Sequence, residues 1–415
     1  MPLWMHRLLS PILPVDRFTK SDRRIVFIIW VAGALQGFAQ AQASASLPFT
    51  RAGLGLSEGE MSLLLGIARL AAFAALPLGW MGDHGGRRRP FLIAITLVVV
   101  GGTIAGLSME AWQFGAAQAV LRTGSAAMSG LALVLLAEKV SPTIRAYSIS
   151  FYGAAVSLGS GMALMTLLLA DGGGESWRIP HLLIGVGILI LPFLIKNVPE
   201  SEVFVDEREH KGHWRDLIGG VWSGRFWTVL AIGFFSSAFS SVALAFSTER
   251  MINQIGFSTG TTIAVSLVGG TIGGAGFFVG GHLADAWGRR NTSALSLLMA
   301  VAGGLVLYWS TSIPVIVAGV VVSSFGIFAF VPAAGSHRAE LFPTSLRASA
   351  MTASANFGLA GSAAGLILGI FIIDKFGLSR SITALGAGML LAALLTMTLP
   401  ETKGQDLTAV ETARL

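Results

Sequence analysis

The chain has 415 residues, yet only 50 of them are Lys, Arg, Asp or Glu, while 53% are hydrophobic. Soluble proteins carry about a quarter charged residues, so a charged share of 12% cannot cover a soluble surface of this size. With a mean hydropathy of +0.72, the composition excludes an ordinary cytosolic enzyme and predicts a surface that faces lipid. The absence of cysteine excludes disulfides, iron–sulfur clusters and thiolate metal sites.

Long uncharged runs mark the segments that can cross a hydrocarbon core of about 30 Å. Residues 25–50 and 348–373 each form a run of 26 residues without a charge, and residues 291–337 hold two spans with a turn near 310–314. Such runs are longer than barrel strands and apolar on all sides, which favours helices. The other predicted spans are 61–82, 91–109, 111–137, 146–170, 179–195, 226–248, 259–281 and 381–400. The sequence therefore predicts an all-α membrane protein with twelve transmembrane helices.

The positions of Lys and Arg predict the orientation in the membrane. If the amino terminus is cytoplasmic, 21 of the 28 basic residues fall in cytoplasmic segments and 5 fall outside; Arg69 and Arg122 lie within spans. This split predicts a multi-pass inner-membrane protein with both termini in the cytoplasm. Pro11 and Pro14 interrupt the first apolar stretch before any cleavage site, so we expect a short interfacial arm there and no cleaved signal.

One motif occurs twice, about 202 residues apart. The pattern G-x-x-x-D-x-x-G-R-R is found at 79–88 and again at 281–290. Two other sets keep nearly the same offset, namely Glu138 and Arg145 with Glu340 and Arg347, and Pro199-Glu200-Ser201 with Pro400-Glu401-Thr402. The repeat predicts two six-helix halves, residues 1–195 and 226–415, joined by a cytoplasmic linker over 196–225. Parallel repeats of this kind predict a substrate site between the halves that opens alternately to each side.

The chain resembles the major facilitator superfamily, and most closely its sugar-porter and metabolite:proton symporter branch. The resemblance rests on the paired motif loops, on Arg122 in the fourth span, and on the sequences P-E-S at 199–201, E-L-F-P-T at 340–344 and P-E-T-K-G at 400–404. It extends over the whole chain and implies a twelve-helix carrier that works by alternating access. It does not imply a substrate.

The repeated charges predict a latch on the cytoplasmic side. An acid at a helix end can accept hydrogen bonds from the start of a neighbouring helix, and the motif arginines lie within reach of nearby glutamates. In the resembled family such pairs hold the cytoplasmic side closed; the alternative is that the arginines only anchor the orientation. His84 and Ala286 stand where the family often has another arginine. The gating residues implied are Asp83, Arg87, Arg88, Glu138, Arg145, Glu200, Asp285, Arg289, Arg290, Glu340, Arg347 and Glu401.

Arg122 is the candidate that carries most information about the cargo. An arginine within a span is costly and usually functional, and Gln118 lies one turn before it on the same face. In related symporters an aspartate of the first helix opposes this arginine, whereas Ala39 stands at that place here, and no acid occurs between Asp22 and Glu58. An unpaired buried cation favours an anion, so we expect an anionic substrate such as a carboxylate.

Further polar residues within the spans are weaker candidates for substrate binding. Gln36 and Gln40 could bind substrate or bridge helices, and Arg69 could line the cavity or pair with backbone carbonyls. Serines in membrane helices often serve close packing instead. Ser237 and Ser241 of the seventh span and Asn356 of the eleventh complete the predicted substrate-binding set. Glu249 is the candidate proton carrier, with an ion pair to Arg250 as the alternative.

Several function classes are disfavoured by what the sequence lacks. Sugar porters of the resembled family have paired glutamines in the seventh span and a stacking tryptophan near the end of the tenth. Here the glutamines are absent and Gly335 stands at the place of the tryptophan, which argues against a sugar as substrate. The fifth span lacks the Gly-Pro pair typical of drug antiporters, which argues against drug export. No ATP-binding motif, metal-ligand spacing or catalytic constellation is present, so we expect no enzyme activity, no cofactor and no nucleic-acid partner. The leading hypothesis is a monomeric carrier of a small organic anion in the lipid bilayer, with protons as candidate coupling ions. The alternatives are a carrier of neutral metabolites, lipids or drugs, and a non-transporting sensor.

Overall fold

The computed structural model describes residues 18–140, 145–200 and 217–403. Throughout these ranges the regular elements are helices, and twelve helical stretches are long and apolar enough to cross a membrane. The all-α class and the twelve predicted spans are confirmed. The turn predicted near 310–314 is also present, since α17 (Arg289–Trp309) ends there and α18 (Ile313–Glu340) begins. The proposed interfacial arm lies outside the described residues.

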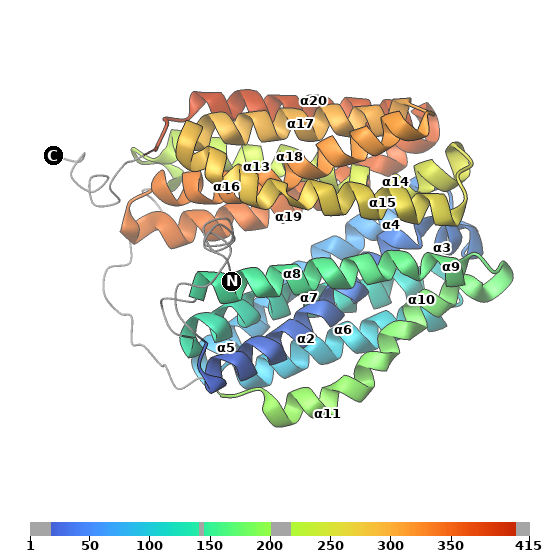
Figure 1. Cartoon of the computed structure of the whole chain (residues 1–415), viewed down its shortest axis with the longest axis horizontal. Coiled ribbons are helices and arrows are strands. Elements are labelled where there is room, and N and C mark those ends of the chain that lie inside the picture. The colour runs from blue at the N-terminus through green and yellow to red at the C-terminus, as the bar shows by residue number, and fades with distance from the viewer. Residues whose placement is uncertain (1–17, 141–144, 201–216, 404–415) are drawn as a thin grey trace, which may run out of the picture. The chain divides into compact units, whose positions relative to one another are not determined.

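The chain forms two compact units (Figure 1). Unit 1 comprises residues 1–45 and 71–206, and unit 2 comprises residues 46–70 and 207–415. The helices of unit 1 are α2 (Lys20–Ala45), η1 (Ala71–Ala75), α5 (Leu76–Gly85), α6 (Arg88–Leu107), α7 (Ala111–Lys139), α8 (Arg145–Met165), α9 (Leu167–Ala170), η3 (Gly174–Trp177), α10 (Arg178–Leu182), η4 (Leu183–Val186) and α11 (Gly187–Asn197). The boundaries predicted for the two halves stay a prediction.

Unit 2 contains a short piece of the first part of the chain together with the second part. Its helices are α3 (Leu47–Gly53), α4 (Glu58–Leu70), α13 (Ser223–Ala245), α14 (Ser247–Glu249), η5 (Arg250–Gln254), α15 (Thr259–Gly274), α16 (Gly276–Trp287), α17, α18, α19 (Thr344–Phe376) and α20 (Leu378–Thr398). In this unit α17 packs on α18, α13 packs on α19 and α20, and α4 packs on α19. Residues 46–70 therefore pack with helices that follow them by about 200 to 300 residues.

Unit 1 is built on two close helix pairs, α2 with α8 and α6 with α7. Their shared core is aliphatic and includes Ile29, Val98 and Leu135, all fully buried. The α2–α8 contact brings backbones together, because a Cβ added to Gly159 would lie 1.9 Å from the carbonyl oxygen of Ala34. Small residues allow such approach between membrane helices, where packing takes the place of the hydrophobic effect. Gly159 is thus a requirement of this interface.

The two motif loops have the same construction in both units. Gly86 precedes α6 with φ = +94°, and Gly288 precedes α17 with φ = +113°, a backbone region that only glycine adopts readily. In unit 2 the Glu401 carboxylate accepts the backbone N–H groups of Arg289 at 2.8 Å and Arg290 at 3.1 Å. A Cβ on Gly288 would lie 2.4 Å from that carboxylate. The glycine therefore provides both the turn and the space for the acid.

Unit 1 repeats this arrangement with Glu200, whose Oε1 accepts the backbone N–H of Arg88 at 3.1 Å. The first N–H groups of a helix have no partner within it and carry partial positive charge, so a carboxylate there stabilises the helix start. The prediction assigned this role to the motif acids Asp83 and Asp285. In unit 2 that assignment is wrong, because Glu401 binds the start of α17 while Asp285 pairs with the guanidinium of Arg289. The side chain of Asp83 lies outside the described residues.

The environment of Glu401 also sets its acidity. Burial by itself disfavours the charged carboxylate, but the backbone N–H groups of Arg289, Lys403, Thr402 and Arg290 together outweigh this effect. They leave the pKa of Glu401 below its ordinary value. The folded state therefore holds the ionised form more tightly than the unfolded chain does.

We predict that Gly159→Ala destabilises the protein by about 1–3 kcal/mol, even though alanine favours helices, because its methyl group would overlap the backbone of α2. The measurement is the thermal unfolding midpoint of purified protein. Gly153→Ala is the matched control, since Gly153 lies on the same helix and an added Cβ there meets nothing within 4 Å. Equal midpoints for the two variants would contradict the packing assignment.

We also predict that Glu401→Gln lowers stability at neutral pH by about 1 kcal/mol, as for a lost helix cap. Because the folded pKa is depressed, the stabilisation by Glu401 is present above its unfolded pKa and is lost as pH falls through the folded pKa. The unfolding midpoints of the wild type and the variant should therefore converge on acidification. A gap that stays constant from neutral to acid pH would rule out this role for the carboxylate.

Candidate functional site

Arg122 lies on α7 in unit 1 and is half-buried. Its Nη2 points to α2, where the carbonyl oxygen of Gln40 lies at 3.4 Å, a long hydrogen bond. Ala39, which stands where related symporters have an acid, is fully buried beside it. Across the ranges that the structure describes, no Asp or Glu contacts the Arg122 guanidinium. The cation is thus held by a single weak carbonyl contact.

Gln36 is committed to protein partners. Its Nε2 donates to the carbonyl oxygen of Ser125 at 2.8 Å and to Oγ of Ser129 at 2.7 Å, and the hydroxyl of Tyr152 donates to its Oε1. Only 2% of Gln36 is exposed. The contacts favour the alternative in which Gln36 bridges α2, α7 and α8, and they leave its amide little capacity for a substrate.

Two other amides beside Arg122 differ from Gln36. The Gln40 side chain is half-buried and makes no hydrogen bond within the described ranges. Gln118 is 1% exposed, and neither its amide oxygen nor its amide nitrogen has a partner among the described residues. A buried amide without partners costs about 1–3 kcal/mol. The stretch of α7 from Gln118 to Arg122 therefore has unused hydrogen-bonding capacity.

The predicted polar residues of unit 2 also differ in whether their side chains are bonded to other parts of the protein. Ser241 is buried and donates to the carbonyl oxygen of Ser362 on α19 at 3.0 Å, which is a packing contact. Ser237 faces Gly358 of α19, where an added Cβ would lie 3.2 Å from its Oγ. Arg69 donates to the hydroxyl of Ser362. Arg69 thus contacts a side chain of α19, a kind of partner that neither of its two predicted roles included.

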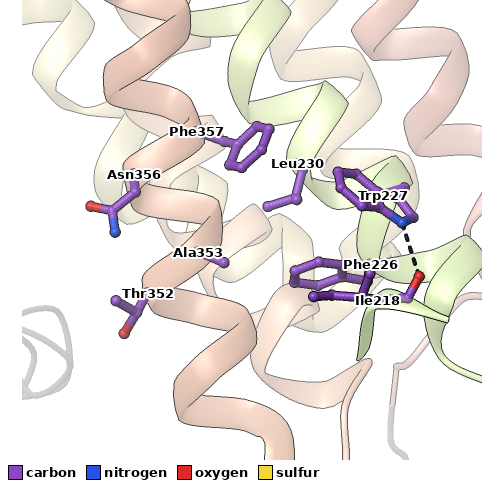
Figure 2. Close-up of a pocket in the computed structure, with 8 residues that line it drawn as sticks. All are labelled: Ile218, Phe226, Trp227, Leu230, Thr352, Ala353, Asn356 and Phe357. Atoms are coloured by element: carbon purple, nitrogen blue, oxygen red, sulfur yellow. Dashed lines mark hydrogen bonds between the residues drawn. The ribbon is translucent and has the colours of Figure 1, made fainter. Parts of the chain in front are cut away.

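Asn356 lines a pocket of about 360 Å³ between α13 and α19 (Figure 2). Figure 2 shows Phe357 pointing toward Leu230 and Trp227, whereas Asn356 points away from these side chains. The pocket wall is almost wholly apolar; its lining residues are Ile218, Phe226, Trp227, Leu230, Thr352, Ala353, Asn356 and Phe357. Asn356 and Thr352 are therefore polar residues in the lining of an otherwise apolar pocket.

The predicted gating residues of unit 2 meet in one charged cluster beside the motif loop. The Arg289 guanidinium contacts Oδ1 of Asp285 at 2.9 Å and Oε2 of Glu340 at 3.2 Å, and it donates to the carbonyl oxygen of Ala284. Glu340 also accepts from the hydroxyl of Thr402. Arg290 contributes its backbone N–H to Glu401, and its Nε is buried without a partner in the described residues.

In unit 1 the corresponding arginines contact backbone carbonyls. Arg87 donates to the carbonyl oxygen of Gly82, and Arg88 donates to that of Ile195 at 2.6 Å. These contacts tie the motif loop to the end of α11. The side chains of Asp83, Glu138, Arg145 and Arg347 lie outside the described residues, so their predicted gating roles stay predictions.

Glu249, the candidate proton carrier, does not pair with Arg250. Its Oε1 lies 2.7 Å from Nη2 of Arg51 and also accepts from the amide of Asn253 at 2.8 Å. Arg250 donates instead to Gln254 and to the carbonyl oxygen of Ser310. Glu249 is fully buried, and its Oε2 has no partner among the described residues. Sequence reasoning missed this pair, although Arg51 and Glu249 are isolated charges at the ends of corresponding spans.

A second contact missed from the sequence joins the same two parts of unit 2. Asp374, at the end of α19, accepts the hydroxyl of Ser57 at 2.7 Å and the backbone N–H of Gly59 at 2.8 Å, so it caps the start of α4. Gln254 donates to Glu58 at 2.9 Å. Glu58 and Asp374 stand next to uncharged runs, but nothing in their spacing along the chain predicts the contacts of Asp374 with Ser57 and Gly59 or of Glu58 with Gln254.

Comparison with known proteins places this arrangement in a family. Residues 29–298 and 270–414 match the model of the Major Facilitator Superfamily. A protein of Cupriavidus pinatubonensis named "Probable 4-methylmuconolactone transporter" is 27% identical over 390 residues, which cover 89% of each chain.

Solved transporter structures share the fold. One is a bacterial homolog of the human lysosomal transporter Spinster in an inward-facing and unoccupied conformation, with a TM-score of 0.74, 16% identity and coverage of 92% of this chain and 97% of that chain. Another is the xylose transporter XylE from E. coli in an inward-open conformation, with a TM-score of 0.72, 18% identity and coverage of 94% and 99%. This chain belongs to the Major Facilitator Superfamily and is a membrane transporter of small metabolites that works by alternating access.

Proposed function

We propose that this transporter carries a small organic anion and that Arg122 balances the negative charge of the cargo. The observation that supports this most is the Arg122 guanidinium, which lies within a span and contacts only the Gln40 carbonyl oxygen among the described residues. A charge in this setting is costly and calls for a counter-charge. A carboxylate matches the two-pronged geometry of a guanidinium.

The name of the Cupriavidus relative supports a carboxylate as the cargo. A methylmuconolactone is an organic acid that carries one carboxylate at neutral pH, on a small lactone ring. Its single charge could be neutralised by a single guanidinium, and its ring oxygens would need neutral donors. The side-chain amides of Gln40 and Gln118 have no hydrogen-bond partner among the described residues, and we assign them as the donors beside Arg122. In unit 2, Asn356, Ser237 and Arg69 remain proposed substrate contacts, whereas Ser241 and Gln36 are assigned to packing.

The membrane orientation follows from the basic residues. With 21 of 28 Lys and Arg residues on one side, we assign the motif loops and both termini to the cytoplasm of a cell whose inner membrane holds the protein. The Arg51–Glu249 pair then belongs to the outer side. We further propose that the protein is a monomer, that it changes no bond in its cargo, and that it needs no cofactor.

The cytoplasmic charges are proposed to act as gates. Arg289 pairs with the exposed carboxylate of Asp285, and a pair that is open to water at one end is worth about 1 kcal/mol or less, which suits a contact that must open in each cycle. Arg289 also contacts Glu340, whose side chain is largely buried. Glu401 and Glu200 hold the starts of the adjoining helices. We extend the gating role to Arg87, Arg88 and Arg290, and to Asp83, Glu138, Arg145 and Arg347, as the sequence repeat predicts.

One observation supports a different cargo. The apolar pocket between α13 and α19 could receive an uncharged ring or chain, with Asn356 as its polar contact. A neutral metabolite, lipid or drug is therefore the second candidate. A sensor on the same fold would show no flux, so uptake by purified protein in proteoliposomes separates it from both carriers.

Glu249 remains our proposed proton-binding group. It is fully buried, and its Oε2 is unbonded in the described part of the chain. Protonation would cancel the negative partner of Arg51. The charged and titratable groups around it are Arg51, Glu58, Asp374, Arg250 and Tyr308.

We predict that Arg122→Ala reduces uptake of 4-methylmuconolactone into proteoliposomes by about 100-fold, because the cargo loses its counter-charge. Arg122→Lys keeps the positive charge but lacks the two-pronged guanidinium, and it should retain uptake within about tenfold of the wild type. Arg380→Ala, which removes an exposed arginine near the start of α20, is the control and should leave uptake unchanged. Normal uptake by a folded Arg122→Ala variant would refute the anion proposal.

We predict that Glu249→Gln removes the dependence of uptake on external pH, because the amide can neither gain nor lose the coupling proton. The measurement is initial uptake rate against pH on the outer side, from pH 5.5 to 8 in ~0.5-unit steps across the range where coupling groups titrate. The wild type should show faster uptake in acid and the variant a flat profile. An acid-stimulated variant would show that another group carries the proton.

A further inference from the structure

A cavity of about 30 Å³ lies within unit 2, bounded by α13, α17, α18 and α20. These helices pack on one another, α17 on α18 and α20, and α13 on α20. One water molecule occupies about 10–15 Å³ of such volume, so the cavity has room for one or two particles of that size. The polar side chains in its wall are those of Ser293, His337, Arg338 and Thr396.

Arg338, on α18, is half-buried and brings a positive charge to the cavity wall. Its Nε donates to the carbonyl oxygen of Ala334 at 3.0 Å and its Nη1 to the hydroxyl of Ser354 at 2.9 Å, while Nη2 makes no hydrogen bond within the described residues. No Asp or Glu of the described ranges contacts this guanidinium. A guanidinium cannot lose its charge, and a charge removed from water is costly without a partner of opposite sign. The Arg338 side chain therefore favours an anion beside it.

Ser293, on α17, is a second hydrogen-bond donor in the same wall. Only 1% of this residue is exposed, and its hydroxyl has no partner in the described part of the chain. Serines in helices commonly donate to a carbonyl oxygen of the preceding turn, as Ser296 does to Thr292 at 2.7 Å. Ser293 makes no such bond, and a buried hydroxyl without a partner destabilises the folded state. A hydrogen-bond acceptor in the cavity would satisfy it.

The other two polar side chains of the wall are bonded to the backbone. The hydroxyl of Thr396 donates to the carbonyl oxygen of Ala392 at 2.8 Å, and Nε2 of His337 donates to that of Pro400 at 2.8 Å. No Asp or Glu lines the cavity. The groups left for a bound particle are thus a cation and a hydroxyl donor, a combination that suits an anion and repels a metal ion.

We propose that this cavity binds a single monatomic anion of the size of chloride, held by Nη2 of Arg338 and the hydroxyl of Ser293. The volume is too small for a metabolite that carries a carboxylate, or for a phosphate. The bound anion joins α17 to α18 and stabilises the helix bundle of unit 2. It is a structural ligand and not the cargo, and its site is distinct from Arg122, which lies in unit 1.

The test is the thermal unfolding midpoint of the purified protein in potassium chloride and in potassium methanesulfonate, both at an ionic strength of about 0.15 M so that charge screening is equal. An anion that binds the folded state raises the midpoint. The wild type should unfold at least about 3 °C higher in chloride. Arg338→Gln should abolish this difference. Any effect of either salt at another site, including Arg122, is shared by the wild type and the variant and cancels in the comparison.

Ser293→Ala is the second variant, and it separates an occupied site from an unused hydroxyl. If Ser293 donates to the anion, the variant should lose most of the chloride-dependent rise. If the hydroxyl has no partner, its removal should raise the midpoint equally in both salts, which would count against the site. Thr292→Val is the matched control, because the Thr292 hydroxyl is also buried without a partner among the described residues but does not line the cavity. It should keep the chloride-dependent rise.

Crystals of the wild type grown in bromide give a direct measurement that needs no variant to fold, because bromide scatters X-rays anomalously. We expect an anomalous peak within hydrogen-bonding distance of Nη2 of Arg338 and Oγ of Ser293. Equal wild-type midpoints in the two salts, a chloride-dependent rise that persists in Arg338→Gln, or bromide crystals without a peak in the cavity would overturn the proposal. Because neither measurement involves cargo, failure of the proposed transport function leaves both unaffected.

Discussion

Within a bilayer, a polar group can be satisfied only by another group of the protein, by its cargo or by water in a cavity, and this constraint sorts the polar residues of the chain. Gln36 meets the constraint with three side chains from neighbouring helices. Ser241 meets it with a carbonyl oxygen of α19. Arg122 has only a long contact to a carbonyl oxygen among the described residues, and for this reason we propose that its charge serves the cargo. Polar residues whose hydrogen bonds are all made within the protein are therefore assigned to packing, and those with unused hydrogen-bonding groups are proposed for the cargo.

The same constraint explains why the spans were predictable. Ten of the twelve spans are uncharged runs, the other two contain one arginine each, and the run 291–337 breaks at the predicted turn. The repeated motif likewise predicted two loops of the same construction, with glycine before the helix start in each. The spacing of residues along the chain does not predict how each helix is rotated about its axis, and so which neighbours a given side chain faces. Gln36 and Gln40 lie one turn apart and have the same side chain, yet one is fully bonded and the other is not.

The partners of charged groups were the least predictable part. Glu249 has Arg250 as its sequence neighbour, but helix geometry directs the two side chains apart, and a residue 198 positions earlier occupies the contact. The sequence predicted that Asp285 accepts hydrogen bonds from a helix start, but Glu401 does so, because the chain after α20 returns to the loop before α17. The break between α2 and α3 at Ser46 was not predicted either, since residues 25–50 form an uninterrupted uncharged run that was read as one span. These features depend on tertiary packing, which spacing along the chain does not encode.

A comparison of an acid with its ester tests whether Arg122 recognises the charge of the cargo. Calorimetric titration of the purified wild-type protein with 4-methylmuconolactone and with its methyl ester, at neutral pH, measures the two affinities. The ester keeps the ring and removes the charge. If the Arg122 charge recognises the cargo, the acid should bind at least about tenfold more tightly than the ester, a difference of at least ~1.4 kcal/mol. Equal affinities, or tighter binding of the ester, would contradict it.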